Sequence, residues 1–569
     1  PNKYQNLSRE DARKAVISDM DQSGYLDKIE DYTNNIGFSE RGNVPIEFYM
    51  SEQWYLKMEE LAKPALKAVN SGEIKFYPAH WTKTYNNWME NIKDWCISRQ
   101  LRWGHQIPVW YHKNDPKKLH VSVNGPDDPE NWIQDEDVLD TWASSWLWPF
   151  AVHGWPNSDQ DLTTFYPTNT LVTGPDIIFF WVARMIMAGY EFLDEIPFKN
   201  VYFTSILRDE TGKKFSKSLG NSPDPFDLFK EYGTDATRFG VMLMAPQGLD
   251  VLFSKSRLEI GRNFMNKLWN ASRFVHMNLE ESKTPEVDLN NVELDLPERW
   301  ILSQLNQTAI RVNHQLDRFH FNEAAKAIYE FTWSDFCDWY IEIAKTRFYG
   351  QDTGKANISR AVAVHTIKGI LTMLHPYSPF ITEEIWSYFR HESDLDLIVS
   401  PWLNGNKDQA DEEADTSMGL LKEIITAIRT IRSRMNVPQT KKADLVIRNV
   451  NGHQAKIESF ENIIKTLGQI EHITLGQDLE KPSQSATAVI QKMELFVPLK
   501  GLINLDQEID RHSKRLNELK EHLAGTEKKL ANENFVRRAP ENVVTHEKQK
   551  LQDMTAEFDL VKANLEMLK

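Results

Sequence analysis

Residues 200–221 read NVYFTSILRDETGKKFSKSLGN, an apolar run that continues into a short lysine-rich loop. The first eight residues are dominated by β-branched and aromatic side chains and predict a buried strand. The loop from Asp209 to Asn221 places three lysines and two serines between two glycines. Ammonium and hydroxyl donors can meet the charge that develops on a phosphate leaving group. The pattern therefore predicts a phosphate-handling loop at the carboxyl end of a strand, although a solvated basic turn is the alternative.

A second strand-to-helix junction lies upstream at Leu171-Val-Thr-Gly-Pro-Asp176, and helical spacing continues to Phe192. Gly174 permits a close approach of the backbone to a ligand, and Asp176 can accept hydrogen bonds from the vicinal hydroxyls of a ribose. Strands that flank helical segments predict the second half of a Rossmann-type, doubly wound α/β nucleotide-binding domain over residues 76–254.

The composition limits the class of protein. A chain of 569 residues with a formal net charge of −16 is expected to hold several domains and to contact RNA only locally. Cys96 and Cys337 are too few for a disulfide scaffold or a four-cysteine zinc site, so a reducing, cytoplasmic setting without zinc is expected. No run reaches the roughly 18 apolar residues of a membrane span. The first residue, Pro1, suggests a piece of a longer chain.

The rest of the chain divides by its periodicity. Residues 1–75 mix polar turns with short apolar pieces, and strand signals disappear after residue 254. An all-α bundle is predicted over residues 255–415, with helices at 255–282, 298–318, 321–349, 356–375 and 379–390. A linker helix at 416–436 and strands at 443–449, 470–475 and 494–498 predict a small α/β unit over residues 416–500.

Residues 501–569 carry apolar residues at alternating spacings of three and four, interrupted at Ala539-Pro540. Two such stripes predict an antiparallel coiled-coil hairpin, and the polar Thr526 and Glu547 would set its register near the tip. Such a hairpin is either a dimerisation arm of a coiled-coil scaffold or an RNA-binding arm. A basic cluster near the tip favours RNA, and its members are Lys528, Lys529, Arg537 and Arg538.

Several segments resemble the class I aminoacyl-tRNA synthetases. Lys214-Phe-Ser-Lys-Ser218 resembles their K-M-S-K-S signature, with Phe215 in place of the usual methionine. The segment Asn91–Pro108 resembles the branch of the family for valine, isoleucine and leucine. The closest resemblance is to the valine-specific branch, and it lies in residues 137–145, 173–184 and 428–438 and in the terminal hairpin. The resemblance covers nearly the whole chain and implies that the helical bundle binds the anticodon.

The resemblance also implies roles for individual residues. Lys214 and Lys217 would be catalytic and would stabilise the phosphates of ATP. The ATP site would consist of Gly174, Asp176, Lys214, Ser216, Lys217 and Ser218. The valine pocket would consist of Trp142, Ile177 and Trp181, unless these are ordinary core residues. tRNA would be bound by Arg429, Arg432, Lys528, Lys529, Arg537 and Arg538, although a solvated helix face explains the first two equally well.

The implied reaction is the ligation of valine to tRNA(Val) through valyl-adenylate, with ATP and Mg²⁺ and with a monomeric enzyme. A second class I signature, H-I-G-H, is not found, and residues 1–75 resemble only the tail of an editing insertion. Half of the nucleotide site and the editing site are therefore expected outside this chain, which alone would be inactive. The alternatives are an isoleucine-specific synthetase and a non-catalytic tRNA-binding fragment.

Overall fold

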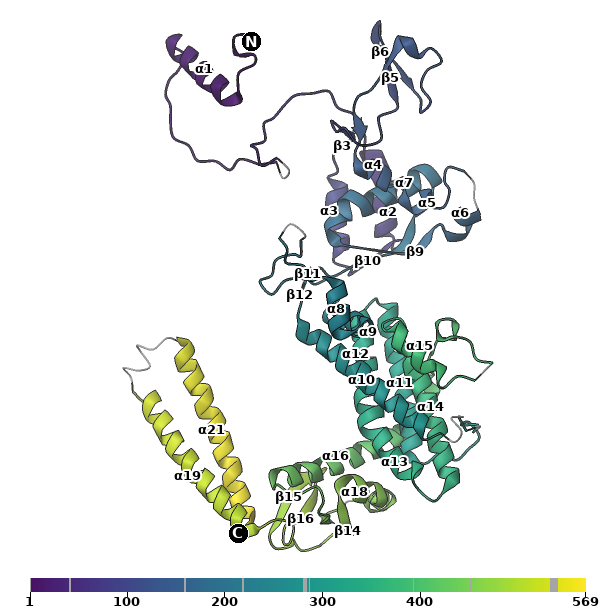
Figure 1. Ribbon diagram of the computed structural model, residues 1–569, viewed down its shortest axis with the longest axis vertical. Helices are drawn as coiled ribbons and strands as arrows, with labels where there is room; N and C mark the ends of the chain where they lie inside the picture. The colour runs from purple at the N-terminus through teal and green to yellow at the C-terminus, as the bar shows by residue number, and fades with distance from the viewer. Residues whose placement is uncertain are drawn as a thin grey trace. The chain divides into compact units, whose positions relative to one another are not determined.

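The computed structural model describes residues 2–39, 42–157, 160–216, 219–279, 284–285, 287–391, 393–450, 452–532 and 541–568 (Figure 1). The chain divides into two units. The first comprises Pro1–Glu60 and Ile92–Ser145, and the second comprises Leu61–Asn91 and Trp146–Lys569. Over the described ranges, no helix combines the length and the apolar character needed to cross a membrane.

The first unit is built from short antiparallel pairings. Helix α1, Arg9–Gln22, is capped by Ser8, whose side chain accepts a hydrogen bond from the Asp11 amide. Part of this unit is a three-stranded antiparallel sheet. Its strands are β5 (Val109–His112), β6 (Asp115–Val121) and β7 (Trp132–Gln134). The remaining elements are η1 (Asn2–Tyr4), β1 (Tyr55–Leu56), β3 (Trp95–Cys96), β4 (Ser98–Arg99), η2 (Pro129–Asn131), β8 (Val138–Leu139) and α4 (Thr141–Ser145).

The second unit begins with a parallel three-stranded sheet in the order β2-β10-β9. The central strand β10, Phe198–Phe203, pairs with β2, Lys75–Tyr77, and with β9, Thr168–Thr173. Val201 of the central strand is fully buried, and helix α7, Ala183–Leu193, is buried along most of its length. Helices α2 (Glu59–Asn70), α3 (Trp81–Glu90), α5 (Trp148–Ala151) and α6 (Gln160–Phe165) complete this part. The parallel sheet confirms a Rossmann-like α/β arrangement.

One predicted strand is divided in two. The run from Asn200 to Leu207 was expected to be continuous, but β10 ends at Phe203 and a separate strand, β11 (Leu207–Arg208), pairs with β12 (Val251–Leu252). The lysine-rich loop therefore leaves from β11 and not from the central strand of the parallel sheet.

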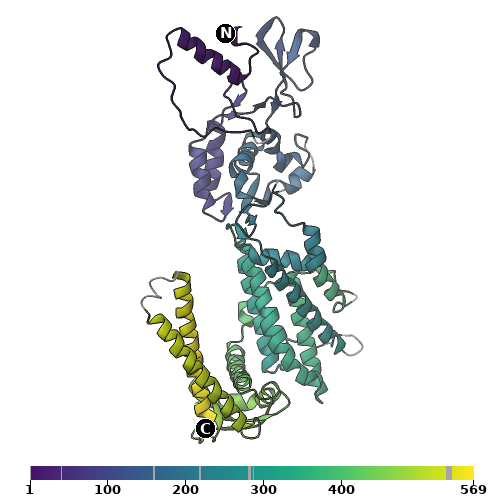
Figure 2. The same cartoon turned by 60° about the vertical axis from the view of Figure 1, so that its left-hand side comes forward.

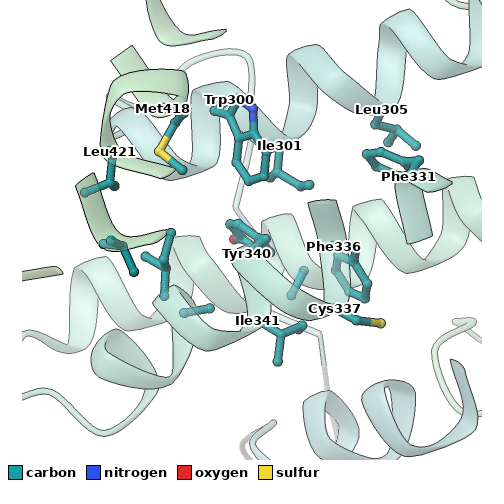
Figure 3. Packing of buried hydrophobic residues seen from close by; sticks show 14 of the residues in the cluster. Trp300, Ile301, Leu305, Phe331, Phe336, Cys337, Tyr340, Ile341, Met418 and Leu421 are labelled. Atoms are coloured by element: carbon teal, nitrogen blue, oxygen red, sulfur yellow. The ribbon is translucent and has the colours of Figure 1, made fainter. Parts of the chain in front are cut away.

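A helical bundle follows, and its first helix begins at Pro225, before the predicted start at residue 255. Its helices are α8 (Pro225–Tyr232), α9 (Thr234–Met244), α10 (Lys255–Met277), α11 (Leu296–Asp317), α12 (Phe321–Glu330), α13 (Ile341–Phe348), α14 (Thr353–Leu374), α15 (Pro379–Ser387) and α16 (Glu412–Arg434). The helix predicted over residues 321–349 contains a ten-residue π-helical stretch, η6 (Phe331–Tyr340), between α12 and α13. Figure 3 shows Phe331 and Tyr340 of this stretch in one core with Trp300 of α11 and Met418 of α16.

A mixed four-stranded sheet in the order β14-β13-β16-β15 forms after α16. Its strands are β13 (Ala443–Arg448), β14 (Ile470–Gly476), β15 (Ser485–Ile490) and β16 (Met493–Pro498), and α17 (Gln454–Ser459) and α18 (Glu461–Gly468) lie between the first two in sequence. Three of the strands match the predicted positions. β15, with the sequence SATAVI, was not predicted.

Two long helices end the chain, α19 (Leu505–Leu530) and α21 (Glu541–Leu568). Figures 1 and 2 show them side by side. They run antiparallel, because Arg515 of α19 pairs with Glu557 of α21 at 2.7 Å while Lys529, further along α19, pairs with Glu547 at 2.5 Å. The predicted break at Ala539-Pro540 lies outside the described residues.

Candidate nucleotide-binding site

The junction after β9 is shaped by a close approach. Gly174 follows the strand in an extended conformation, with φ −76° and ψ 149°, and a 3₁₀ turn over Pro175–Ile177 comes next. A Cβ atom at Gly174 would lie 2.5 Å from Oδ1 of Asp176. Glycine is therefore needed here for space and not for backbone freedom, because any larger residue would displace the Asp176 carboxylate.

The lysine-rich loop and this junction meet. Lys214 Nζ lies 2.8 Å from Asp176 Oδ2, and 55% and 52% of the two side chains are exposed to solvent. The hydrogen bond from Lys214 is the main cause that lowers the pKa of Asp176 below its ordinary value. Asp176 therefore remains a carboxylate at neutral pH. The candidate phosphate-binding ammonium and the candidate ribose-binding carboxylate, 38 residues apart in sequence, share one site.

The loop rests on an apolar base. Phe215 packs edge to face on Phe253, with 5.9 Å between the ring centroids. Next to it lies a cavity of about 410 Å³, lined mainly by apolar side chains that include Leu207, Val241 and Met242. Phe215 thus serves as the apolar contact expected where the family signature has methionine.

The described part of the loop has a defined backbone. Gly212 has φ +83° and Gly220 has φ +63°, conformations that favour glycine. The Ser216 amide donates to Oδ1 of Asn221 at 2.9 Å. Lys217 and Ser218, the other two predicted members of the ATP site, lie outside the described residues.

The predicted valine pocket is divided between the two units. Trp142 lies on α4 in the first unit, whereas Ile177 and Trp181 lie in the second. Ile177 ends the 3₁₀ turn, and Trp181 lies in a π-helical turn, η4, over Ile178–Val182. The two residues therefore lie in a 3₁₀ turn and a π-helical turn and not in one regular α-helix. Both side chains are partly buried, and Trp181 packs on Trp148 with 5.8 Å between the ring centroids.

The two arginines of α16 differ. Arg429 is exposed, and its guanidinium lies over the ring of Trp339 at 5.5 Å. Arg432 is buried, and it donates to the backbone carbonyl oxygens of Gln469, Pro438 and Lys441 at 2.8–3.3 Å. The expectation that Arg432 contacts tRNA is therefore corrected, because its guanidinium is engaged inside the fold, where it joins α16 to the turn at Pro438–Lys441 and to Gln469.

The basic cluster of the terminal helices is only partly described. Lys528 is exposed, and Lys529 pairs with Glu547 across the two helices. Glu547, for which a register-setting role was predicted, is thus the partner of Lys529, and the role itself stays a prediction. Arg537 and Arg538 lie outside the described residues.

Known families match three consecutive parts of the chain. The profile described as "tRNA synthetases class I (I, L, M and V)" matches residues 8–125 and 117–254. "Anticodon-binding domain of tRNA ligase" matches residues 298–447, and "Valyl tRNA synthetase tRNA binding arm" matches residues 504–569. The Rossmann-like part falls within the first match, most of α11 and all of α12 to α16 fall within the second, and the terminal helices fall within the third.

Individual relatives extend the match along the chain. The valine-tRNA ligase of Bacillus subtilis (strain 168) is 42% identical over 569 residues, which is 100% of this chain and 64% of that protein. The valine-tRNA ligase of Listeria innocua serovar 6a is 44% identical over 570 residues, with the same two shares. A methionyl-tRNA synthetase structure from Mycobacterium tuberculosis is 18% identical with a TM-score of 0.49, over 62% of this chain and 66% of that one. This chain therefore spans about two thirds of the length of its relatives and belongs to the valine-tRNA ligase family of class I tRNA synthetases.

Proposed function

We propose that the whole protein ligates valine to tRNA(Val) through valyl-adenylate and that this chain supplies the lysine-loop half of the ATP site together with the tRNA-binding domains. The contact between Lys214 and Asp176 is the observation that carries the proposal, because it joins a phosphate-binding group to a ribose-binding group. Identity of 42–44% along the whole chain supports the assignment to valine.

In this proposal each group has a distinct task. ATP binding releases Lys214 from Asp176, so that the ammonium moves to the phosphates and the carboxylate accepts hydrogen bonds from the ribose hydroxyls. Breaking the ion pair costs little free energy, because a half-exposed ion pair contributes only about 0–1 kcal/mol. Gly174 leaves room for the adenosine beside the backbone. Lys217, Ser216 and Ser218 are assigned to the same phosphates.

The chemistry requires positioning and charge stabilisation but no protein nucleophile. A carboxylate oxygen of valine attacks the α-phosphorus of ATP, and pyrophosphate leaves. A ribose hydroxyl of the tRNA then attacks the carbonyl carbon of valyl-adenylate, and AMP leaves. Mg²⁺, when bound, would neutralise charge on the phosphates, and we assign no protein ligand to it.

The substrate and tRNA contacts are part of the same proposal. Trp142, Ile177 and Trp181 are assigned to the valine side chain. On the tRNA side the assignment keeps the exposed Arg429 and the basic cluster Lys528, Lys529, Arg537 and Arg538, and it omits the buried Arg432. The enzyme is proposed to be a cytoplasmic monomer that needs no zinc.

The proposed domains follow the predicted boundaries. They are a return segment from an editing insertion (1–75), the half catalytic domain (76–254), the anticodon-binding bundle (255–415), the α/β unit (416–500) and the tRNA-binding arm (501–569). We propose that the arm is a coiled coil, in keeping with the antiparallel course of α19 and α21.

Valine-dependent exchange of pyrophosphate into ATP tests the catalytic role. It should be measured on this chain and on a protein that spans the full length of the relatives. Replacing Lys214 by Met in the longer protein should lower exchange by about 10²–10³-fold, the usual loss for one donor to a transition-state charge. Lys213→Met is the matched control, since Lys213 is the neighbouring exposed lysine, and it should stay within a few-fold of wild type. Equal losses in both variants would contradict the role of Lys214.

A second candidate function is that of a tRNA-binding module, and the matches to an anticodon-binding domain and to a tRNA-binding arm favour it for this chain by itself. Filter binding at a stated salt concentration separates the two. Preference for tRNA(Val) that falls when the anticodon is changed, without pyrophosphate exchange, is expected of the chain alone. Robust exchange by the chain alone would contradict the module.

A further inference from the structure

The two ends of the lysine-rich loop are joined by a pair of side chains to which neither the sequence patterns nor the family matches assign a role. Asp209 Oδ2 accepts a hydrogen bond from Asn221 Nδ2 at 2.8 Å, although the two residues are 12 positions apart. The pair lies outside the Lys214–Asp176 contact and touches neither of its side chains in any described hydrogen bond. We call it the loop clasp.

Asp209 organises the first half of the loop. Its Oδ1 atom accepts from the Thr211 amide at 2.9 Å, from the Thr211 hydroxyl at 2.7 Å and from the Lys213 amide at 2.9 Å. The Asp209 amide in turn donates to the Lys213 carbonyl at 2.9 Å. Both polar backbone atoms of Lys213 are therefore held by the residue that begins the loop, and Lys214 follows directly.

Asn221 organises the second half. Its Oδ1 atom accepts from the Ser216 amide at 2.9 Å, and its Nδ2 atom donates to the Lys214 carbonyl at 3.3 Å as well as to Asp209. A single amide side chain thus holds the backbone on both sides of Phe215. Only a group with one acceptor and two donors can do this, so aspartate cannot replace Asn221.

The charge of Asp209 fits this arrangement. Hydrogen bonds, first from Asn221 and then from Thr211, hold the pKa of Asp209 well below its ordinary value. The group therefore acts as a constant acceptor at neutral pH and not as a proton-transfer group.

We propose that Asp209 and Asn221 are positioning residues, which hold the backbone of Lys214 and Ser216 so that their donors meet the phosphates of ATP. The inference rests on the proposed function of the loop. It extends the phosphate site from Lys214 and Ser216 to a clasp that touches no substrate and acts only through these two residues.

Limited proteolysis of the full chain tests the clasp without any assay of activity. Trypsin cleavage after Lys213 and Lys214 should be about ten-fold faster in Asn221→Ala than in wild type, since the loop backbone loses its hydrogen bonds and opens more often. Asn221→Asp should be at least as sensitive, because two carboxylates would then face each other. Leu219→Ala is the matched control, because this side chain of the same loop is exposed.

A charge swap makes the test specific to the pair. In Asp209→Asn/Asn221→Asp, the new asparagine can donate to the new aspartate, so cleavage should be slower than in Asn221→Asp alone. Unchanged cleavage in Asn221→Ala, or a swap no slower than the single variant, would overturn the clasp.

Pyrophosphate exchange in a protein of the relatives' full length then tests the positioning. In Asn221→Ala we expect the KM for ATP to rise and kcat to fall, so that kcat/KM for ATP is about ten-fold lower. The KM for valine should be unchanged. A loop that becomes sensitive to trypsin while exchange stays at the wild-type level would overturn the positioning role. If Asn221→Ala and Lys214→Met both leave exchange unchanged, the proposed function of the loop fails. If only Lys214→Met lowers exchange, the function of the loop stands and only the positioning role of the clasp is refuted.

Discussion

Replacement of Arg347 by Met should destabilise the helical bundle more than any surface substitution in it. Glu298 of α11 is 0% exposed, and its Oε2 atom pairs with Arg347 of α13 at 2.8 Å. Its Oε1 atom accepts from the Ser359 hydroxyl of α14 at 2.6 Å. The Arg347 side chain is only 18% exposed, so solvent cannot readily replace it. The variant leaves a buried carboxylate without an opposite charge.

The magnitude follows from that unpaired charge. Removing one partner of a buried ion pair costs about 3–5 kcal/mol, and we expect the lower end because Ser359 still donates to Glu298. A neutral residue would avoid most of this cost, so Glu298→Gln/Arg347→Met should recover about 2 kcal/mol. Adding Glu298→Gln to Arg347→Met should therefore raise the stability of the variant, although the loss of a second buried polar contact would ordinarily lower it.

The same argument gives a pH dependence. Burial is the main cause that raises the pKa of Glu298 above its ordinary value. A raised folded-state pKa means that the fold favours the protonated acid, so this contribution to stability is present at low pH and is lost as pH rises through the folded-state pKa. The defect of Arg347→Met should accordingly shrink on acidification, because Glu298 then takes up a proton and no longer needs the guanidinium.

Amide hydrogen exchange of the full chain, followed by mass spectrometry, measures the effect in peptides of α11, α13 and α14 without requiring global two-state unfolding. Arg390→Met is the matched control, because Arg390 pairs with Asp396 at the surface of the same bundle and such pairs contribute about 0–1 kcal/mol. The reasoning would be refuted if Arg347→Met lost no more protection than the control variant. It would also be refuted if adding Glu298→Gln did not reduce the loss.

Three further outcomes concern the candidate sites. Lys214→Met should raise the pKa of Asp176 towards its ordinary value, since the hydrogen bond from Lys214 is the main cause of the depression, and an NMR titration of labelled aspartate should detect this shift. The Lys214–Asp176 pair stabilises the fold above the unfolded-state pKa of Asp176, and this stabilisation is lost as pH falls. It should be absent in Lys214→Met at every pH. Gly174→Ala should displace the Asp176 carboxylate and weaken ATP binding by about ten-fold in calorimetry, as expected for the loss of one hydrogen bond to a charged group, while hydrogen exchange elsewhere stays unchanged. Arg432→Met should cost about 2–3 kcal/mol in exchange-derived stability, whereas Arg429→Ala should leave stability within about 0.5 kcal/mol and weaken tRNA retention on filters.

Sequence periodicity located most of the regular elements, because helices and strands are set by local patterns of apolar residues. The helix predicted over 298–318 is observed as Leu296–Asp317, and the strand predicted over 470–475 is observed as Ile470–Gly476. The π-helical stretch Phe331–Tyr340 was not predicted, because it interrupts the hydrogen bonding of a helix without interrupting its apolar pattern. Strand β15 was not predicted, because its small residues, Ser485 to Ala488, carry little strand propensity of their own. They form a strand by pairing with the neighbouring strand β16.

Residue type and short spacing were enough to predict a lysine loop after a strand, Gly174 two residues before Asp176, and a terminal pair of apolar stripes. Which of these groups meet depends on how the chain folds. The tertiary structure joins Lys214 to Asp176 across 38 residues and Asp209 to Asn221 across 12, and it buries Arg432 while leaving Arg429 exposed. The physical reason is that hydrogen bonds and burial depend on distances between segments, which the packing of the sheet, the loop and the helices sets and which no local pattern encodes.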